Sequence, residues 1–128
     1  MKGPEMTVKV LVVDDSALAR RTLREILEGA GYEVAEASDG LNALERYFIE
    51  KPTIVMLDLV MKGMYGLDVL TKLRELDPDV KVIVVSADIQ TSSHELVYDA
   101  GGISFVNKPF DRHEILTAVD AALARGVA

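Results

Sequence analysis

The strongest constraint on the fold is a pattern that recurs five times, in which a short apolar run precedes a segment whose apolar residues have helical spacing. The runs lie at 8–13, 32–37, 53–57, 81–85 and 103–106. Four of them are almost continuously apolar, which is typical of parallel strands that helices cover on both faces. The run at 32–37 alternates in polarity over part of its length, so we expect it at an edge of the sheet. The pattern predicts an α/β protein with five strands and five helices.

Residues that favour helix starts and stops divide the chain at short intervals. The candidate starts are Ser16, Asp39, Ser92 and Asp111, and the candidate stops are Gly29, Gly31, Pro78, Gly101 and Gly102. Glutamates three residues after two of these starts, Glu95 and Glu114, have the spacing of a capping box. The loops between elements are therefore short and leave no linker. We expect a single domain over residues 1–128, with its core at about 8–124.

Charge and composition exclude several classes of function. A formal net charge of −7 argues against a general nucleic-acid binder, which needs a concentrated excess of basic residues. The basic cluster Arg20, Arg21 and Arg24 is expected to be the solvated face of a helix. The chain has no cysteine, which fits a reducing compartment. It also has neither an apolar stretch near the roughly 20 residues of a membrane span nor a secretory signal at its start. We expect a cytoplasmic protein with no membrane or nucleic-acid partner.

Carboxylates follow two of the apolar runs. Asp14 and Asp15 come after the first run, and Asp58 comes after the third. If these runs are neighbouring parallel strands, the acids meet at one edge of the sheet, where two like charges repel by about 4 kcal/mol at an effective dielectric of about 20. Such a cluster needs a cation. Carboxylate oxygens with no histidine or cysteine nearby suit Mg²⁺.

Two further polar side chains follow other strands of the predicted sheet. Ser86 follows the fourth run and Lys108 follows the fifth. With a cation bound, a carboxylate can attack phosphorus and form an aspartyl phosphate. We choose Asp58 as this nucleophile because it ends its strand alone, whereas Asp14 and Asp15 form a pair that can hold the metal. Lys108 and Ser86 would then stabilise the phosphoryl oxygens. Each residue alone has an ordinary structural explanation, but their positions at four strand ends favour a common site.

At these residues the chain resembles the receiver domain of two-component response regulators, over residues 8–123. The resemblance rests on Val12-Val-Asp-Asp-Ser16, on Met56-Leu-Asp-Leu-Val-Met61 with Gly63 and Gly66, on Val84-Val-Ser-Ala87, and on Phe105-Val-Asn-Lys-Pro-Phe110. It implies a flavodoxin-like, doubly wound, five-stranded parallel sheet in the order 2-1-3-4-5. This strand order is taken from the family and not from the residues.

The resemblance also implies roles for individual residues. Asp58 would accept a phosphoryl group from a histidine kinase or a histidine phosphotransfer protein. Mg²⁺ would be bound by Asp14, Asp15 and Asp58 with the backbone carbonyl of Val60. Lys108 would be joined to Pro109 by a cis peptide. The protein would not be an enzyme with an external substrate, because its expected reactions are its own phosphorylation and dephosphorylation.

A conformational switch is a further implication of the resemblance. Ser86 would move toward the phosphoryl group, and Phe105 would pack into the vacated space. Many members of the family have tyrosine at the position of Phe105, so the switch here would act through bulk. The readout surface would be the fourth helix, which starts near residue 92, the fifth strand at 103–106 and the fifth helix, which starts near residue 111. This surface would control an output protein, in a chemotaxis-like pathway, a phosphorelay or the control of a kinase.

Some positions depart from the family or affect the lifetime of the phosphoryl group. Lys62 stands where the family often has proline, and Tyr65 where it often has aspartate. Val60 and Asp88 occupy positions that usually tune dephosphorylation, and we expect substitution of either residue to change its rate. Val60 cannot orient an attacking water.

Two alternative functions remain open. One is a receiver-like interaction module that works without phosphorylation. The other is a flavodoxin-type binder of flavin mononucleotide, which shares the architecture. The flavin phosphate would need hydroxyls and backbone donors after the first strand, where this chain has Asp14 and Asp15. A turnover kinase or phosphatase is not favoured, because the chain has no glycine-rich phosphate loop.

Several other side chains are expected to be structural. His94 and His113 have no second ligand at metal spacing, and we expect both to be exposed. Tyr47 and Tyr98 fit helical positions and are expected to pack against the sheet or its edge. Met56 is expected in the core.

Overall fold

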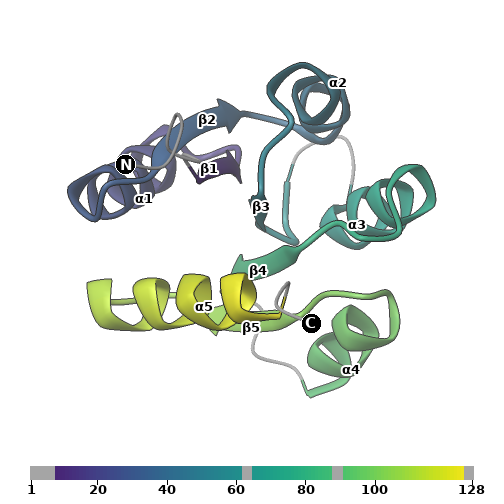
Figure 1. Ribbon diagram of the computed structural model, residues 1–128. Helices are drawn as coiled ribbons and strands as arrows, with labels where there is room; N and C mark the ends of the chain where they lie inside the picture. The colour runs from purple at the N-terminus through teal and green to yellow at the C-terminus, as the bar shows by residue number, and fades with distance from the viewer. Residues whose placement is uncertain (1–7, 62–64, 88–90, 126–128) are drawn as a thin grey trace.

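The chain folds into a five-stranded parallel sheet with helices on both faces, as seen in a computed structural model that describes residues 8–61, 65–87 and 91–125 (Figure 1). The strands are β1 (Lys9–Val13), β2 (Glu33–Ala37), β3 (Ile54–Leu57), β4 (Val82–Ser86) and β5 (Ser104–Asn107). The helices are α1 (Ala17–Gly29), α2 (Gly40–Glu50), α3 (Gly66–Leu76), α4 (Thr91–Asp99) and α5 (Arg112–Ala124). Each expected strand is present, and no strand start or end differs from the expected bound by more than one residue.

The strand order is β2-β1-β3-β4-β5, with all neighbours parallel. This is the order expected from the family resemblance, and it puts β2 at an edge as its alternating polarity predicts. β1 and β3 are neighbours, in a register that pairs Val13 with Leu57. The residues that follow these two strands, Asp14 and Asp58, therefore leave the sheet side by side.

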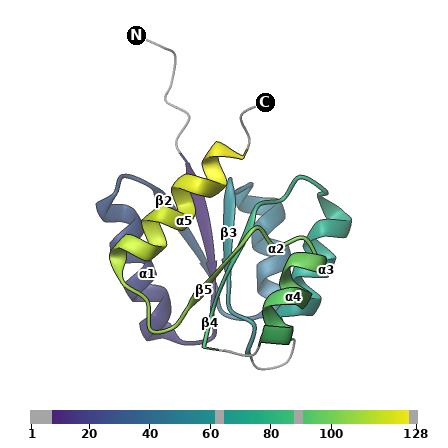
Figure 2. The ribbon, with the colours of Figure 1, turned by 90° about the horizontal axis from the view of Figure 1, so that it is seen from below.

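Two apolar layers hold the helices on the sheet. One face of the sheet packs against α1 and α5 through a core that includes Leu23, Leu27 and Ile115. The opposite face packs against α2, α3 and α4 through Ala43, Leu70 and neighbouring side chains. The sheet lies between these layers (Figure 1). Its carboxyl ends all point to one edge, the lower edge in Figure 2.

Helix boundaries follow the capping residues in most cases. The side chain of Ser16 accepts a hydrogen bond from the backbone N–H of Ala19 at 3.2 Å. The side chain of Asp39 accepts one from the backbone N–H of Asn42 at 2.7 Å. Asp111 and Glu114 form a reciprocal capping box. The expectation for Ser92 is wrong, because α4 already contains Thr91.

Glycines end two of the helical segments in a conformation that favours glycine. Gly31 has a φ of 93° and Gly101 a φ of 103°, both in the left-handed region that side chains rarely adopt. The helix α3 stops at Leu76, before Pro78, as predicted. Among the helices that the structure describes, none has the length and apolar character needed to span a bilayer.

Candidate functional site

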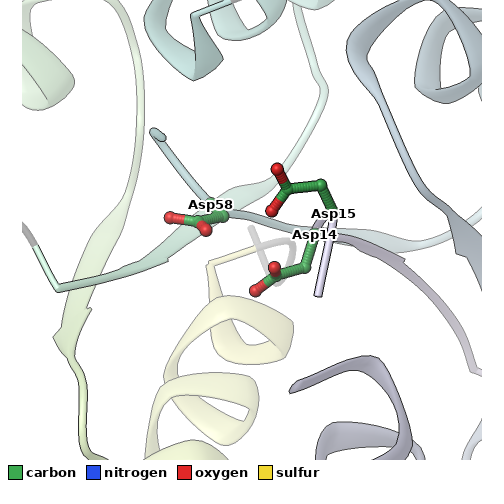
Figure 3. Close-up of side chains that lie close together, drawn as sticks. All are labelled: Asp14, Asp15 and Asp58. Carbon is green, nitrogen blue, oxygen red and sulfur yellow. The ribbon is translucent and has the colours of Figure 1, made fainter. Parts of the chain in front are cut away.

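Three carboxylates meet at the carboxyl edge of the sheet. One oxygen atom each from Asp14, Asp15 and Asp58 lies within 4.8 Å of the others (Figure 3). Asp14 and Asp58 are only 2% and 7% exposed, while Asp15 is exposed. The register between β1 and β3 places them in this way. The structure thus brings together the three acids that the sequence pattern singles out, and it buries two of them.

The side chain of Asp14 contacts both the residue that caps α1 and Lys108. Its Oδ1 accepts a hydrogen bond of 2.9 Å from the backbone N–H of Ser16. Its Oδ2 lies 2.7 Å from the Nζ of Lys108. The backbone carbonyl of Asp14 accepts a 2.6 Å hydrogen bond from Nη1 of Arg20. These contacts fix the orientation of a buried carboxylate next to the candidate nucleophile.

Lys108 connects two of the acids. Besides Asp14, its amino group reaches Oδ2 of Asp58 at 3.4 Å. Burial acts to lower the pKa of Lys108, but the hydrogen bond to Asp14 and the nearby charges outweigh burial, so its pKa is raised. Its backbone N–H donates to the carbonyl of Ser86 at 2.9 Å. The peptide bond between Lys108 and Pro109 is cis, as the resemblance implied.

Asp58 is surrounded by groups with opposite effects on its ionisation. Burial is the main reason why its pKa is raised, and the charge of Asp14 raises it further. The charge of Lys108, the backbone N–H of Val60 and the hydroxyl of Ser86 act in the other direction without outweighing these effects. The N–H of Val60 lies 3.3 Å from Oδ1 of Asp58. Ser86, the last residue of β4, is fully buried.

The cluster has an excess of negative charge that a bound cation would offset. Three carboxylates face one lysine, and the described residues bring no histidine or cysteine into the cluster. Hard oxygen ligands of this kind suit Mg²⁺, which commonly binds one or two carboxylates together with phosphoryl oxygens and water. The residues present therefore fit a divalent metal beside a phosphoryl group.

The loop after Asp58 is shaped around a glycine. A Cβ added to Gly66 would overlap the carbonyl oxygen of Asp58 and lie 2.5 Å from Cα of Leu59. The backbone N–H of Gly66 donates to the carbonyl of Leu59 at 2.8 Å. Tyr65 is exposed, while Lys62 lies outside the described residues. The start of α3 thus packs directly on the backbone of the candidate nucleophile.

Phe105 contacts His94, which was expected to be exposed. Its ring, partly buried against the core, stacks on His94 of α4 with the centroids 3.8 Å apart. Nε2 of His94 is buried and has no hydrogen-bond partner in the part of the chain that the structure describes. The expectation that His94 is exposed is therefore wrong, whereas His113 is exposed as expected. Helical spacing from buried Val97 was the available signal for an inward position of His94.

The basic cluster of α1 is also more structured than expected. Arg20 and Arg24 bind the carboxylate of Glu36 on β2, with Nε–O distances of 2.9 and 2.6 Å. Only Arg21 is exposed as a solvated face requires. Because Arg20 also holds the carbonyl of Asp14, it supports the site. The side chain lengths allow this contact, but the sequence pattern does not indicate it.

The remaining structural expectations have mixed outcomes. Met56 is in the core, and Tyr47 packs on the core while its hydroxyl donates to Asp77 at 2.6 Å. Tyr98 is 52% exposed and lies at the edge of the sheet, where it lines a cleft together with Lys81 and Ile103. Asp88 lies outside the described residues.

The sequence matches the family model for the response regulator receiver domain over residues 10–120. The chain is 40% identical over 116 residues to chemotaxis protein CheY of Thermotoga maritima, covering 90% of this chain and 97% of that protein. It is 37% identical over 120 residues to the response regulator MprA of Mycobacterium ulcerans. That match covers 94% of this chain but 52% of MprA, so the chain spans about half the length of such relatives.

A solved structure shares the fold. One chain in the crystal structure of the CheX–CheY–BeF3–Mg²⁺ complex from Borrelia burgdorferi superimposes with a TM-score of 0.88 at 30% identity. The match covers 91% of this chain and 89% of that one.

Proposed function

This chain belongs to the response regulator receiver domain family, and we propose that it accepts a phosphoryl group onto Asp58 and thereby controls a partner protein. The observation that carries the proposal is the placement of Asp58. Its buried carboxylate lies beside the carboxylates of Asp14 and Asp15 and within 3.4 Å of the Lys108 amino group. A nucleophile, a place for a metal and a cation for phosphoryl oxygen are thus combined at one edge.

In the proposed reaction, a carboxylate oxygen of Asp58 attacks the phosphorus of a phosphohistidine. A new P–O bond to Asp58 forms while the P–N bond breaks, and the leaving imidazole nitrogen takes up a proton. Lys108 and the hydroxyl of Ser86 donate hydrogen bonds to the phosphoryl oxygens. Attack by water later releases phosphate and regenerates Asp58. The chain changes only its own state, so it acts as a phosphoacceptor and not as a turnover enzyme.

The metal proposed for the site is Mg²⁺. The carboxylates of Asp14, Asp15 and Asp58 with the backbone carbonyl of Val60 would hold it. When bound, Mg²⁺ supplies positive charge that offsets both the acids and the phosphoryl group. The carboxylate excess over Lys108 in this cluster supports the assignment.

The proposed output is a change in the surface formed by α4, β5 and α5. Ser86 follows the phosphoryl group, and Phe105 moves with it, so the surface beside both residues changes. The phosphodonor would be a histidine kinase or histidine phosphotransfer protein, and the output partner a protein. The solved structure of a complex between CheY and another protein, CheX, supports a protein as the partner.

We also propose that the chain acts as a single receiver domain over 1–128, in a cytoplasmic, chemotaxis-like system. Support comes from the CheY relative, of which the match covers 97%. The MprA relatives indicate the other arrangement, in which a receiver is about half of a longer regulator.

The deciding experiment is the intact mass of the protein after incubation with acetyl phosphate, with and without Mg²⁺. We expect one phosphoryl adduct that requires Mg²⁺ and is absent from Asp58→Asn. Asp39→Asn, which changes an exposed carboxylate at the start of α2, is the matched control and should form the adduct. An adduct that persists in Asp58→Asn would place the acceptor elsewhere.

The two alternatives have distinct outcomes. An interaction module that works without phosphorylation would form no adduct with acetyl phosphate or with a histidine kinase, yet would fold normally. A flavodoxin-type protein would show the visible absorption of bound flavin. The negative charge of the buried Asp14, directly after β1, would repel a flavin phosphate at that position.

A further inference from the structure

A polar cleft lies at the edge of the sheet opposite to Asp58. It has a volume of about 620 Å³, within the usual range for small-molecule sites. It is formed where α3 and α4 end and where β4 and β5 begin. The residues that define its chemistry are Arg74, Asp79, Lys81, Tyr98, Gly101 and Arg125. None of them belongs to the proposed phosphoacceptor site.

The cleft concentrates positive charge in an acidic protein. Arg74, Lys81 and Arg125 line it from three different parts of the chain, against a single acid, Asp79. Within residues 8–61, 65–87 and 91–125, none of these three cations forms an ion pair with a carboxylate. Exposed charges farther than about 8 Å away are largely screened at physiological ionic strength. The net charge of the whole chain therefore does not cancel the local excess, and the cleft favours an anion.

The turn between α4 and β5 shapes the floor of the cleft. The guanidinium of Arg74 lies against Gly101, where an added Cβ would overlap it. The backbone N–H groups of residues 100–103 already donate to carbonyls of the chain. An anion in the cleft would therefore be bound by the cationic side chains and not by main-chain donors.

Tyr98 adds an aromatic surface beside these cations. It belongs to the last turn of α4, lines the cleft and is 52% exposed. Nucleic-acid bases stack on aromatic rings of this kind, and the stacking is independent of base identity because every base has a π face. We infer that the cleft binds a small molecule that carries both phosphate groups and a planar ring, as a nucleotide does. The phosphates face Arg74, Lys81 and Arg125, and the ring stacks on Tyr98.

The inference is tested by titration calorimetry of the full chain with ADP, pyrophosphate and adenosine, in the presence of EDTA. Chelation removes divalent cations that would bring phosphates to the acid cluster. We expect ADP to bind more tightly than pyrophosphate or adenosine. Arg74→Gln and Arg125→Gln should each weaken ADP binding by about fivefold, the upper range for one exposed charge pair. Arg21→Gln, which removes the same charge from the exposed side of α1, should leave binding unchanged.

Tyr98 variants separate the ring from the phosphates. Tyr98→Ala should reduce the affinity for ADP to that for pyrophosphate, whereas Tyr98→Phe should keep the affinity for ADP. These side chains are exposed, so the substitutions should not unfold the protein. Absence of saturable ADP binding overturns the inference, as does an equal loss in Arg21→Gln. If pyrophosphate binds as tightly as ADP and Tyr98→Ala has no effect, a nucleotide-like ligand is wrong.

Discussion

The imidazole of His94 lies face to face with the ring of Phe105, with centroids 3.8 Å apart and planes inclined by 22°. This pair joins α4 to β5 at the aromatic residue that we propose to move on phosphorylation. Nε2 of His94 is buried without a hydrogen-bond partner among the described residues. The ring is therefore held by packing on Phe105 and its surroundings, and not by a polar contact through this atom.

Removal of the His94 ring should destabilise the protein. An aromatic pair contributes about 0.5–1.5 kcal/mol beyond its buried area, so we expect His94→Ala to lower the free energy of unfolding by about 1 kcal/mol or more. Urea denaturation measures this change. His113→Ala is the control, because His113 is exposed on α5, and it should have little effect. Equal stability of the two variants would contradict a structural role for the stacked ring.

The acid cluster should cost the protein stability when no metal is bound. Burial and the charge of Asp14 raise the pKa of Asp58. A carboxyl group with a raised folded-state pKa stabilises the fold below its ordinary pKa of 3.8, and this contribution is lost as the pH rises through the folded-state value. At pH near 7 the ionised Asp58 is therefore unfavourable. We expect Asp58→Asn to melt at a higher temperature than the parent in EDTA, with a difference that shrinks as the pH falls toward the ordinary value.

Addition of Mg²⁺ provides the complementary measurement for Asp58→Asn. A ligand that binds only the folded state raises its stability by mass action, so Mg²⁺ should raise the melting temperature of the parent more than that of the variant. An Asp58→Asn protein that melts below the parent in EDTA would show that the contacts of Asp58 with Lys108 outweigh burial and repulsion.

Glu36 should show the opposite dependence on pH. Burial, the largest single effect, raises its pKa, but hydrogen bonds from Arg24 and Arg20 outweigh it, and the pKa is lowered below 4.5. Such a carboxylate stabilises the fold above its ordinary pKa, and the contribution is lost as the pH falls through the folded-state value. Because exposed ion pairs contribute about 0.2–1 kcal/mol each, Glu36→Gln should lose about 1 kcal/mol at neutral pH.

The pH series for Glu36 has a neighbouring control on the same strand. Glu33 is exposed on β2 and has no ion pair within the described part of the chain, so Glu33→Gln should be close to neutral. The loss in Glu36→Gln should disappear in acid, where the parent carboxylate is protonated. A loss that is independent of pH would point to packing and not to charge.

The sheet and the acid cluster were predictable because they depend on a pattern that recurs along the whole chain. Apolar runs separated by helical spacing require parallel strands, and parallel strands bring Asp14, Asp58 and Ser86 to one edge. The strand order itself came from the family resemblance, because several orders bury the same apolar runs. Helix starts at Ser16 and Asp111 were predictable from local hydrogen-bonding chemistry.

Side-chain partners across the fold were not predictable from the same patterns. The helical pattern identifies the apolar side of α1, but it does not tell how far the arginine side chains reach around the helix. Arg24 therefore was expected in solvent but contacts Glu36 on β2. The stacking of His94 on Phe105 depends on the relative position of α4 and β5, which no local spacing specifies.

Gly66 should be required both for stability and for the geometry of Asp58. A Cβ at this position would overlap backbone atoms of Asp58 and approach Leu59, so the start of α3 would have to move. Overpacking of this kind costs about 1–3 kcal/mol. We expect Gly66→Ala to lose this much stability in urea denaturation and to form the acetyl phosphate adduct more slowly.

Gly29→Ala is the matched control for Gly66. The added Cβ at Gly29 would meet only the end of the flexible Arg112 side chain, at 3.3 Å. Since alanine favours a helix more than glycine does by about 1 kcal/mol, Gly29→Ala should be neutral or stabilising. A Gly66→Ala protein as stable and as rapidly phosphorylated as the parent would contradict the close contact with Asp58.

Val60 should slow the loss of the phosphoryl group, because its side chain offers no polar atom beside Asp58. The side chain is 62% exposed, while the backbone N–H already contacts Oδ1 of Asp58. Val60→Gln keeps this N–H and adds an amide that can hydrogen-bond an attacking water. We therefore expect dephosphorylation to become severalfold faster, as measured by the decay of the phosphoryl adduct in intact mass after removal of acetyl phosphate. Ile49→Gln makes the same kind of change at an exposed position on α2 and should leave the rate unchanged. An unchanged rate in Val60→Gln would mean that the attacking water is oriented from another part of the site.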